Sequence, residues 1–327
     1  MHWLERHWYR LTPLHLILWP LSLLFAALAA LRRGLYRCGV LARSPISVPV
    51  ILVGNLSVGG SGKTPLTLFL AEQLRLRGWH PGIISRGYGG TASAPQAVTA
   101  TSPADRVGDE PLLMAQRGLC PVWIGRDRPA AAQALLAAQP ECNVILSDDG
   151  LQHYRLPRAV EIVVVDGVRR FGNGLLLPAG PLREPLSRLR GVDAVVVNGG
   201  VAGAGEWAMQ LTGVRCFNLR DPARWRELAD FRGQRVHAVA GIGHPERFFT
   251  QLEQAGLTLI RHPFPDHHRF TPSDLAFPAG EVVLMTEKDA VKCARFANEN
   301  CWLLRVEAQL SPDLVTTLLK KITPHGR

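Results

Sequence analysis

Residues 57–64 read Ser57-Val58-Gly59-Gly60-Ser61-Gly62-Lys63-Thr64, and this loop stands between an apolar run at residues 48–53 and a helical pattern at residues 65–77. Backbone N–H groups of a loop in this position converge on the phosphates of a nucleotide, helped by the positive end of the following helix. Lys63 would reach the β- and γ-phosphates, and the Thr64 hydroxyl would bind Mg²⁺. The motif therefore predicts a nucleoside triphosphate site formed by the whole loop. The competing interpretation is a glycine-rich turn that contains a lysine by chance.

Short apolar runs alternate with helical patterns along most of the chain. In the first part the candidate strands are residues 48–53, 82–84, 122–124, 143–146, 161–165 and 194–197. In the last part they are residues 235–239, 258–261, 282–285 and 302–306, and a helix follows near residues 312–321. Continuous apolar strands between helices predict an α/β fold of the phosphate-loop NTPase type, with a mostly parallel sheet and helices on both faces.

A glycine-rich, weakly patterned stretch at residues 198–205 suggests a break between two domains. We therefore expect a nucleotide-binding core domain at residues 45–198 and a smaller C-terminal α/β domain at residues 199–327. Residues 1–44 precede the alternating pattern and form a separate N-terminal region.

The composition excludes several classes of protein. Of the 327 residues, 47% are hydrophobic and 20% are charged, proportions that exclude a disordered chain. The formal net charge of +10 indicates an acidic partner, such as nucleic acid, an anionic membrane or a phosphorylated substrate. No nucleic-acid-binding motif accompanies this charge, so we expect no nucleic-acid partner. The six scattered cysteines indicate reduced side chains in a cytosolic compartment, with neither a disulfide scaffold nor a zinc site.

The N-terminal region contains an uncharged segment, residues 11–31, that is long enough to cross a bilayer as a helix. Arginines flank it on both sides, and the more numerous ones that follow would hold the rest of the chain on the cytoplasmic side. A cleaved signal peptide and a buried core helix are the competing interpretations, the latter because His15 and Pro20 weaken the spanning signal. We expect a membrane-associated helix, and the sequence does not separate spanning from lying in the interface.

Two carboxylates follow a second buried strand. Ser147-Asp148-Asp149-Gly150 comes directly after the apolar run at residues 143–146. A carboxylate at the carboxyl end of a parallel strand beside a phosphate loop can hold Mg²⁺ directly or through water. Asp148 and Asp149 are therefore candidate metal ligands together with Thr64, and the alternative is that Asp-Asp-Gly forms an ordinary turn.

Seven sequence blocks in a fixed order resemble one enzyme family, the tetraacyldisaccharide 4′-kinases of lipid A biosynthesis. The blocks are Gly54-Asn55-Leu56-Ser57-Val58-Gly59-Gly60-Ser61-Gly62-Lys63-Thr64-Pro65, Ser85-Arg86-Gly87-Tyr88, Gly108-Asp109-Glu110-Pro111, Asp148-Asp149-Gly150-Leu151-Gln152-His153, Leu177-Pro178-Ala179-Gly180-Pro181-Leu182-Arg183-Glu184-Pro185, Phe264-Pro265-Asp266-His267-His268 and Met285-Thr286-Glu287-Lys288-Asp289-Ala290-Val291-Lys292. The resemblance extends from the apolar N-terminal segment to about Lys292. In this family a serine in the position of Ser57 is usual, although the general loop pattern has glycine there.

The resemblance implies a reaction and a setting. The γ-phosphate of ATP, bound with Mg²⁺, would pass to the 4′-hydroxyl of a tetraacyldisaccharide 1-phosphate and form lipid IVA. The acceptor would be an acylated phosphodisaccharide lipid at the cytoplasmic face of the bacterial inner membrane, with no obligate protein partner. A basic protein surface suits a phosphorylated acceptor embedded in an anionic membrane.

The resemblance also implies roles for two residues of the reacting site. A sugar hydroxyl must lose a proton to attack phosphorus, and Asp109 matches the family's proposed general base. The competing interpretation is a helix cap, because Asp109-Glu110-Pro111 also suits the start of a helix. His267 matches the histidine that pairs with this aspartate, although Asp266-His267-His268 alone also fits a metal ligand set or a polar loop. Together with Lys63, these residues are the candidate catalytic set, and the site would lie between the two domains.

Several further residues are candidates for substrate or metal binding. Guanidinium groups match phosphate in a bidentate manner, so Arg86 and Arg183 would bind substrate, with Gln152 and His153 lining the same site. Glu184 would add to the Mg²⁺ ligands. Arg126 and Arg128 are weaker phosphate-binding candidates. The segment that contains Lys288 and Asp289 does not match a guanine-binding motif and is interpreted as structural.

One alternative function remains on the sequence evidence. A phosphate-loop protein can be an ATPase or GTPase that works as a switch or chaperone and has no small-molecule acceptor. Such a protein releases free phosphate, whereas a kinase labels its acceptor.

Overall fold

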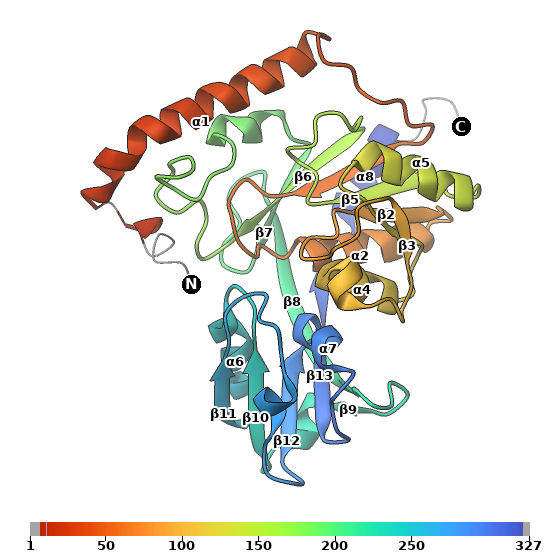
Figure 1. Cartoon of the computed structure of the whole chain (residues 1–327), viewed down its shortest axis with the longest axis vertical. Coiled ribbons are helices and arrows are strands. Elements are labelled where there is room, and N and C mark those ends of the chain that lie inside the picture. Colours follow the sequence, from red (N-terminus) through yellow and green to blue (C-terminus); the bar gives the residue numbers. More distant parts are fainter. Residues whose placement is uncertain (1–6, 11, 323–327) are drawn as a thin grey trace.

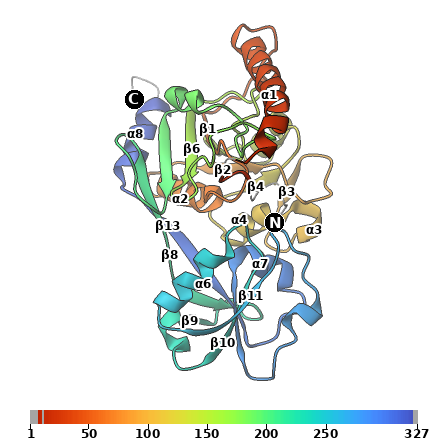
Figure 2. The ribbon, with the colours of Figure 1, turned by 90° about the vertical axis from the view of Figure 1, so that its left-hand side faces the viewer.

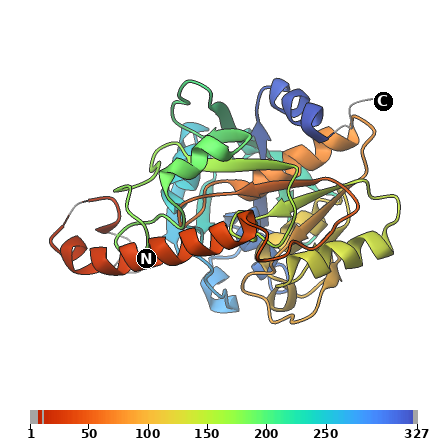
Figure 3. The same ribbon diagram turned by 90° about the horizontal axis from the view of Figure 1, so that it is seen from above.

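The structure, a computed structural model, describes residues 7–10 and 12–322. It consists of two lobes and one long helix, α1 (Leu14–Arg37), which lies along one side of the upper lobe (Figure 1). The upper lobe, called the core lobe, contains β1–β7 and α2–α5, and the lower, C-terminal lobe contains β9–β12, α6 and α7. Figure 2 shows the same separation, and Figures 2 and 3 both show α1 on the outside of the core lobe. The expected mostly parallel α/β architecture is confirmed.

The core lobe is built on a sheet with the order β7-β6-β1-β5-β2-β4-β3. Every pair in it is parallel except β3 with β4, which is antiparallel. The strands are β1 (Val50–Gly54), β2 (Pro81–Ser85), β3 (Gln96–Val98), β4 (Val122–Ile124), β5 (Val144–Asp148), β6 (Val160–Asp166) and β7 (Ala194–Asn198). Each residue of β1, β5 and β6 is buried, which explains why their sequences are continuous apolar runs.

Helices cover this sheet and fix the loops at its carboxyl edge. They are α2 (Lys63–Arg75), α3 (Ala104–Val107), α4 (Asp109–Gln116) and α5 (Arg128–Ala138), and the 3₁₀-helix η2 (Leu186–Gly191) precedes β7. Leu66, Leu70 and Leu74 lie at helical spacing on α2 and are at most 1% exposed. The predicted helix after the phosphate loop is therefore present, and it begins at Lys63 rather than at Pro65.

The C-terminal lobe has its own mostly parallel sheet, in the order β11-β10-β12-β13. Its elements are β9 (Trp225–Glu227), η3 (Leu228–Phe231), β10 (Arg235–Ala240), α6 (Pro245–Gln254), β11 (Thr258–Pro263), η4 (Pro272–Leu275), β12 (Val282–Thr286) and α7 (Glu287–Cys293). Two long strands, β8 (Trp207–Asn218) and β13 (Cys301–Gln309), pair antiparallel with each other. They join the lobes, because β8 also pairs with β7 of the core lobe.

The last helix, α8 (Asp313–Ile322), returns to the core lobe. Leu314, Val315 and Leu318 belong to the same apolar cluster as α2 and β6 and are at most 2% exposed. The expected domain boundary after residue 198 coincides with the end of β7, but α8 packs with the domain that precedes the boundary. We therefore propose that the core domain includes α8 as well as residues 45–198.

Helix α1 is attached to the core lobe by one polar side. Ser22, which is 4% exposed, donates to the carbonyl of Leu176 at 2.8 Å and accepts from the N–H of Ala179 at 3.0 Å. Seven residues earlier, on the same face, His15 contacts the amide of Asn173 at 3.0 Å. Among the described residues, α1 is the one helix long and apolar enough to cross a membrane. Only 11% of its most apolar 18-residue stretch is buried in the protein.

Candidate functional site

The phosphate loop connects β1 to α2 at the carboxyl edge of the core sheet. Hydrogen bonds from outside the loop hold its backbone: Asn198 donates to the carbonyl of Ser61 at 3.0 Å, and Arg169 donates to the carbonyl of Gly60 at 2.6 Å. Gly62 has a φ of +96°, and a Cβ there would lie 2.4 Å from the Asn198 amide nitrogen. Only glycine fits this position. These contacts fix the conformation of the loop, as a phosphate site requires.

Two cationic side chains meet one carboxylate next to this loop. Lys63 lies 3.5 Å from Asp149, and Arg183 lies 3.3 Å from the same carboxylate. Burial disfavours the charged form of Asp149, but Lys63, Arg183 and Arg128 together hold its pKa below the usual value. Two of the predicted groups, Lys63 and Arg183, are therefore placed where a nucleotide's phosphates would meet both cations.

Asp148 differs from its neighbour because it is completely buried at the end of β5. Neither of its carboxylate oxygens has a hydrogen-bond partner among the described residues. Burial, reinforced by the charge of Glu110, raises its pKa to about 7, whereas Lys63 acts to lower it. An unpartnered carboxylate beside the phosphate loop fits a divalent cation.

A metal ion here would need more than protein ligands. Among residues 7–10 and 12–322, no group of three or more His, Cys, Asp or Glu side chains could hold one. Mg²⁺ is commonly held by one or two carboxylates together with the phosphates of a substrate. We propose Thr64, Asp148 and Asp149 as a set of that kind.

Glu184 has different surroundings. It is 2% exposed, accepts from the Tyr154 hydroxyl at 2.7 Å, and lies 3.2 Å from Arg188 and 3.8 Å from Arg33. Its neighbour Arg183 contacts Asp149 beside the phosphate loop, whereas Glu184 contacts Tyr154 and Arg188. We leave Glu184 out of the metal set that we propose.

Arg128 is a structural residue that the sequence did not single out as such. It is fully buried and donates to the backbone carbonyl of Asp148 at 2.7 Å. Burial lowers its pKa to about 10, although Asp148 and Asp149 act in the opposite direction. Arg128 therefore holds the turn that contains Asp148 and Asp149. Arg126, in contrast, is exposed.

Three of the remaining substrate candidates come from the same edge of the core sheet. Gln152 follows β5 and donates to the carbonyl of Asn55 at 3.4 Å, just before the phosphate loop. His153 is partly buried, and burial together with the charges of Arg128 and Arg86 lowers its pKa to about 4. It is therefore neutral at pH 7. Arg86 follows β2 and is exposed.

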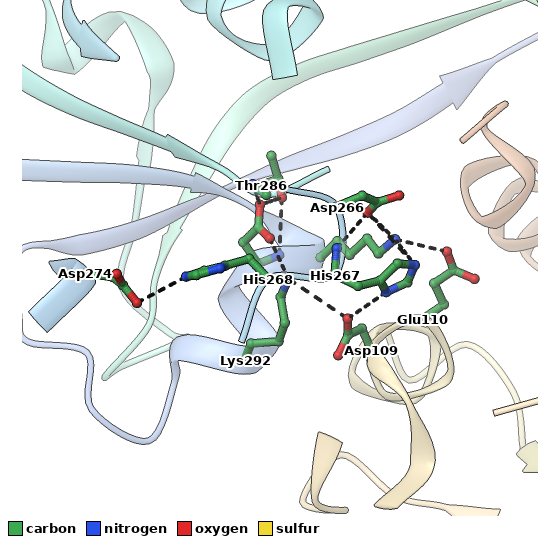
Figure 4. A network of polar contacts seen from close by, with 11 residues as sticks. Asp109, Glu110, Asp266, His267, His268, Asp274, Thr286 and Lys292 are labelled. Carbon is green, nitrogen blue, oxygen red and sulfur yellow. Dashed lines mark hydrogen bonds and ion pairs between the residues drawn. The ribbon is translucent and has the colours of Figure 1, made fainter. Parts of the chain in front are cut away.

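Asp109 and His267 meet across the two lobes. Asp109 is the first residue of α4, and His267 lies in the loop after β11, with its Nδ1 3.5 Å from Oδ2 of Asp109 (Figure 4). The cap of α4 is Gly108, and no side chain caps the helix. The Asp109 carboxylate is thus directed to the other lobe and does not cap its own helix.

The loop conformation places the imidazole of His267. Its φ is +59°, which is uncommon for a residue other than glycine. The ring centroids of His267 and Tyr88 are 5.2 Å apart, so an aromatic side chain of the core lobe supports the imidazole. Tyr88 belongs to the same block as Arg86, yet its contact with His267 was not predicted.

Two lysines of α7 complete the contact between the lobes (Figure 4). Lys288 lies 3.5 Å from Glu110 and 3.2 Å from Asp266, and Lys292 lies 4.0 Å from Asp109. This segment was predicted to be structural. That description suits Asp289, which is buried and accepts from the N–H of Gly241 at 2.8 Å. Lys288 instead lines the cavity between the lobes.

A cavity of about 700 Å³ joins these groups. The core lobe contributes the phosphate loop from Gly60 to Thr64 together with Glu110. The C-terminal lobe contributes residues 242–244, Asp266 and Lys288. The space is large enough for a nucleotide, and cationic side chains line both of its sides.

Comparisons with known proteins agree with one another. The family model described as tetraacyldisaccharide-1-P 4′-kinase matches residues 14–323. The chain is similar to the tetraacyldisaccharide 4′-kinase of Methylobacillus flagellatus, with 54% identity over 98% of this chain and 96% of that protein. The enzyme of the same name from an Azoarcus species is also 54% identical, over 98% of this chain and 95% of its own length. A crystal structure of the "apo" form of LpxK from Aquifex aeolicus in complex with ATP matches with a TM-score of 0.80 and 30% identity, covering 95% of this chain and all of that one.

Proposed function

The chain belongs to the tetraacyldisaccharide-1-phosphate 4′-kinase family, and from this premise we propose how its residues transfer the γ-phosphate of ATP to the 4′-hydroxyl of a tetraacyldisaccharide 1-phosphate. The observation that carries the proposal is the position of the Asp109–His267 pair. It lies at the contact between the lobes, where Glu110 and Asp266, the neighbours of the pair in sequence, line the same cavity as the phosphate loop. We infer that the donor site and the base act within one space between the lobes.

The core lobe binds the donor. The phosphate loop surrounds the β- and γ-phosphates with its backbone N–H groups, and Lys63 and Arg183 add positive charge on the side where Asp149 now holds them. Mg²⁺, held by Thr64, Asp148 and Asp149, would neutralise charge on the phosphoryl oxygens when bound. The two unpartnered oxygens of Asp148 support this assignment.

The pair across the lobes prepares the acceptor. Asp109 accepts the proton of the 4′-hydroxyl, and His267, 3.5 Å away, orients the carboxylate and shares the developing charge. Lys292, 4.0 Å from Asp109, places a positive charge beside this carboxylate. Arg86, Gln152 and His153 line the acceptor side at the edge of the core sheet, and His153, neutral at pH 7, offers one donor and one acceptor to a sugar.

The reaction can be followed with labelled ATP. The purified chain, incubated with γ-labelled ATP and the monophosphorylated disaccharide in neutral detergent micelles, is expected to place the label on the 4′ position. Release of free labelled phosphate without transfer to the lipid would instead identify a switch-type ATPase. Asp148→Asn should increase the Mg²⁺ concentration needed for half-maximal rate, whereas Asp105→Asn, an exposed acid on α3, should not.

Helix α1 gives the protein a membrane-facing side. The leucines opposite the docked face are more than half exposed: Leu16, Leu21, Leu23, Leu24, Leu28 and Leu31. Because Ser22 and His15 bind the core lobe, a spanning orientation would bring the loop at residues 173–179 into hydrocarbon. We infer that α1 lies in the interface at the cytoplasmic face of the inner membrane, with its apolar face in the lipid.

This placement has a matched test. The double change Leu24→Glu and Leu28→Glu should weaken vesicle binding strongly without altering stability, since both side chains are exposed. Leu76→Glu with Val214→Glu adds the same two charges at exposed apolar positions elsewhere and should leave vesicle binding unchanged. Equal losses in the two variants would contradict the role of α1.

A further inference from the structure

A second cavity, of about 500 Å³, lies at the C-terminal end of α1 and shares no lining residue with the cavity between the lobes. Its most prominent feature is a set of six arginines. They are Arg33, Arg37, Arg43, Arg158, Arg188 and Arg190. They come from α1, from the segment after it, from the loop before β6 and from η2, so the fold brings them together from four parts of the chain.

Two of the arginines form the wall of the cavity. Arg158 lies 2.5 Å from Glu161, and Arg188 lies 2.6 Å from the same carboxylate. Arg188 also lies 3.2 Å from the buried Glu184. Glu161, which lines the cavity, and the buried Glu184 are thus paired with the two wall arginines, which largely neutralise their negative charge.

The other four arginines keep their charge available. Arg37, Arg43 and Arg190 are exposed, and no ion pair joins them to any acid in the described part of the chain. Arg33 has its nearest carboxylate, that of Glu184, at 3.8 Å. Six arginines against two glutamates leave a surplus of four positive charges around one concave site. Such a site favours an anion with several acceptor oxygens.

The position of the cavity identifies the anion. Arg33 and Arg37 lie in the last turns of α1, directly after the exposed leucines that end at Leu31, so the cavity stands at the level of lipid head groups when the apolar face of α1 is in the membrane. The rings of Tyr36 and Tyr154, with centroids 5.9 Å apart, add an aromatic side suited to the membrane interface. We propose that this cavity binds the phosphate-bearing head group of an anionic phospholipid, an inference that rests on the membrane association proposed above.

Vesicle binding tests the proposal with the full-length chain. The variant Arg37→Gln, Arg43→Gln, Arg190→Gln removes three exposed charges and leaves the wall pairs of Glu161 intact. Its control, Arg75→Gln, Arg224→Gln, Arg295→Gln, removes three exposed charges from other faces of the molecule. Vesicles of phosphatidylcholine alone are compared with vesicles that contain one third phosphatidylglycerol, at physiological salt.

The cavity variant should need on the order of 100-fold more phosphatidylglycerol vesicles for half-saturation, because it removes three basic side chains and each contributes on the order of fivefold at an anionic surface. The control variant should stay within about twofold of wild type, and binding to pure phosphatidylcholine should be equal in all three proteins. Equal weakening of the two variants would show a general charge effect and overturn the proposal.

Two further outcomes are distinguishable. A rise in KM for the disaccharide acceptor in neutral micelles, where no phospholipid is present, would assign the cavity to the acceptor's own phosphate and overturn the proposal. Wild-type protein that binds neither kind of vesicle would refute the membrane association itself. Wild-type protein that binds both kinds equally would refute only the head-group site.

Discussion

The phosphate loop and the Asp109–His267 pair are held in different ways, although the phosphate loop lines the same cavity as Glu110 and Asp266, the sequence neighbours of the pair. The loop is bound within the core lobe by hydrogen bonds of 2.6 to 3.2 Å from Arg169, Asn198 and Asn55. The pair is assembled from two lobes through contacts of 3.5 to 4.0 Å between partly exposed side chains. The donor side of the site is therefore complete in one lobe, whereas the acceptor side depends on how closely the lobes approach.

Lys63→Ala tests the donor side and should have the largest effect. The change removes the side chain that we propose to bind the β- and γ-phosphates, so the transfer rate should fall by about 10³-fold, with weaker ATP binding. Steady-state kinetics and ATP titration measure the two effects. Lys320→Ala, an exposed lysine on α8, is the control and should be neutral. A Lys63→Ala protein with normal turnover would place the nucleotide elsewhere.

Asp109→Asn tests the acceptor side. An amide cannot take the proton of the sugar hydroxyl, so kcat should fall on the order of 10²-fold while ATP binding stays close to wild type. The separation of kcat from ATP affinity distinguishes this variant from Lys63→Ala. Asp105→Asn, which changes an exposed acid in the neighbouring helix α3, should keep the full rate. Full activity in Asp109→Asn would remove this residue as the base.

The Arg117–Glu287 pair tests whether the approach of the lobes matters. Arg117 follows α4 and donates to Glu287 of α7 at 2.8 Å and to the carbonyl of Val306 in β13 at 2.7 Å. Arg117→Met leaves a buried carboxylate without its partner and should lower the free energy of unfolding by about 3 kcal/mol.

The double variant Arg117→Met, Glu287→Leu should regain much of this stability, because no buried charge is left unpaired. Its kcat should nevertheless stay about tenfold below wild type with nearly unchanged ATP affinity, since α4 and α7 carry Asp109 and its lysine partners. A double variant with wild-type kcat would show that the pair stabilises the fold without positioning Asp109.

His153→Gln should give the smallest effect, confined to the core lobe. The pKa of His153 is about 4 in the folded protein, below the ordinary value of 6.5, so the unfolded chain binds a proton at a higher pH than the folded one. The free energy of unfolding should therefore fall as the pH drops from about 6.5 to about 4, with about 1–2 kcal/mol from this partly exposed group.

Urea unfolding at about pH 7.5 and about pH 5 measures this contribution of His153 to the free energy of unfolding. The difference between the two pH values should be smaller in His153→Gln than in wild type. His80→Gln, which replaces an exposed histidine, should keep the wild-type difference. An unchanged pH dependence in His153→Gln would show that His153 titrates normally in the folded protein.

The donor side of the site was predictable because it is local in sequence. A strand, a glycine-rich loop and a helix follow one another, and the φ of +96° at Gly62 is a property that the motif itself encodes. The Asp109–His267 contact was predictable only through the family resemblance, since nothing in either local pattern indicates its partner. The lysines Lys288 and Lys292 were missed for the same reason.

Other differences have local physical causes. Glu184 was predicted to add to the metal ligands, yet its carboxylate contacts the hydroxyl of Tyr154 and the guanidinium of Arg188, contacts that no local pattern indicates. Strand β8 was not predicted, because it crosses from one lobe to the other and its burial follows no regular alternation. The packing of α8 against the core lobe is a tertiary contact. The apolar face of the helix predicts that it is buried, but does not indicate which lobe it packs against.

The position of α8 has a consequence for synthesis. Its buried leucines fill part of the same apolar cluster as α2 and β6, and burying such side chains contributes roughly 1.5–3 kcal/mol each. The nucleotide-binding half therefore cannot be finished on the ribosome until the whole C-terminal lobe has been translated. Until α8 has been synthesised, the nascent chain exposes the apolar surface of α2 and β6 that α8 later covers. Chaperones can bind this surface during that time.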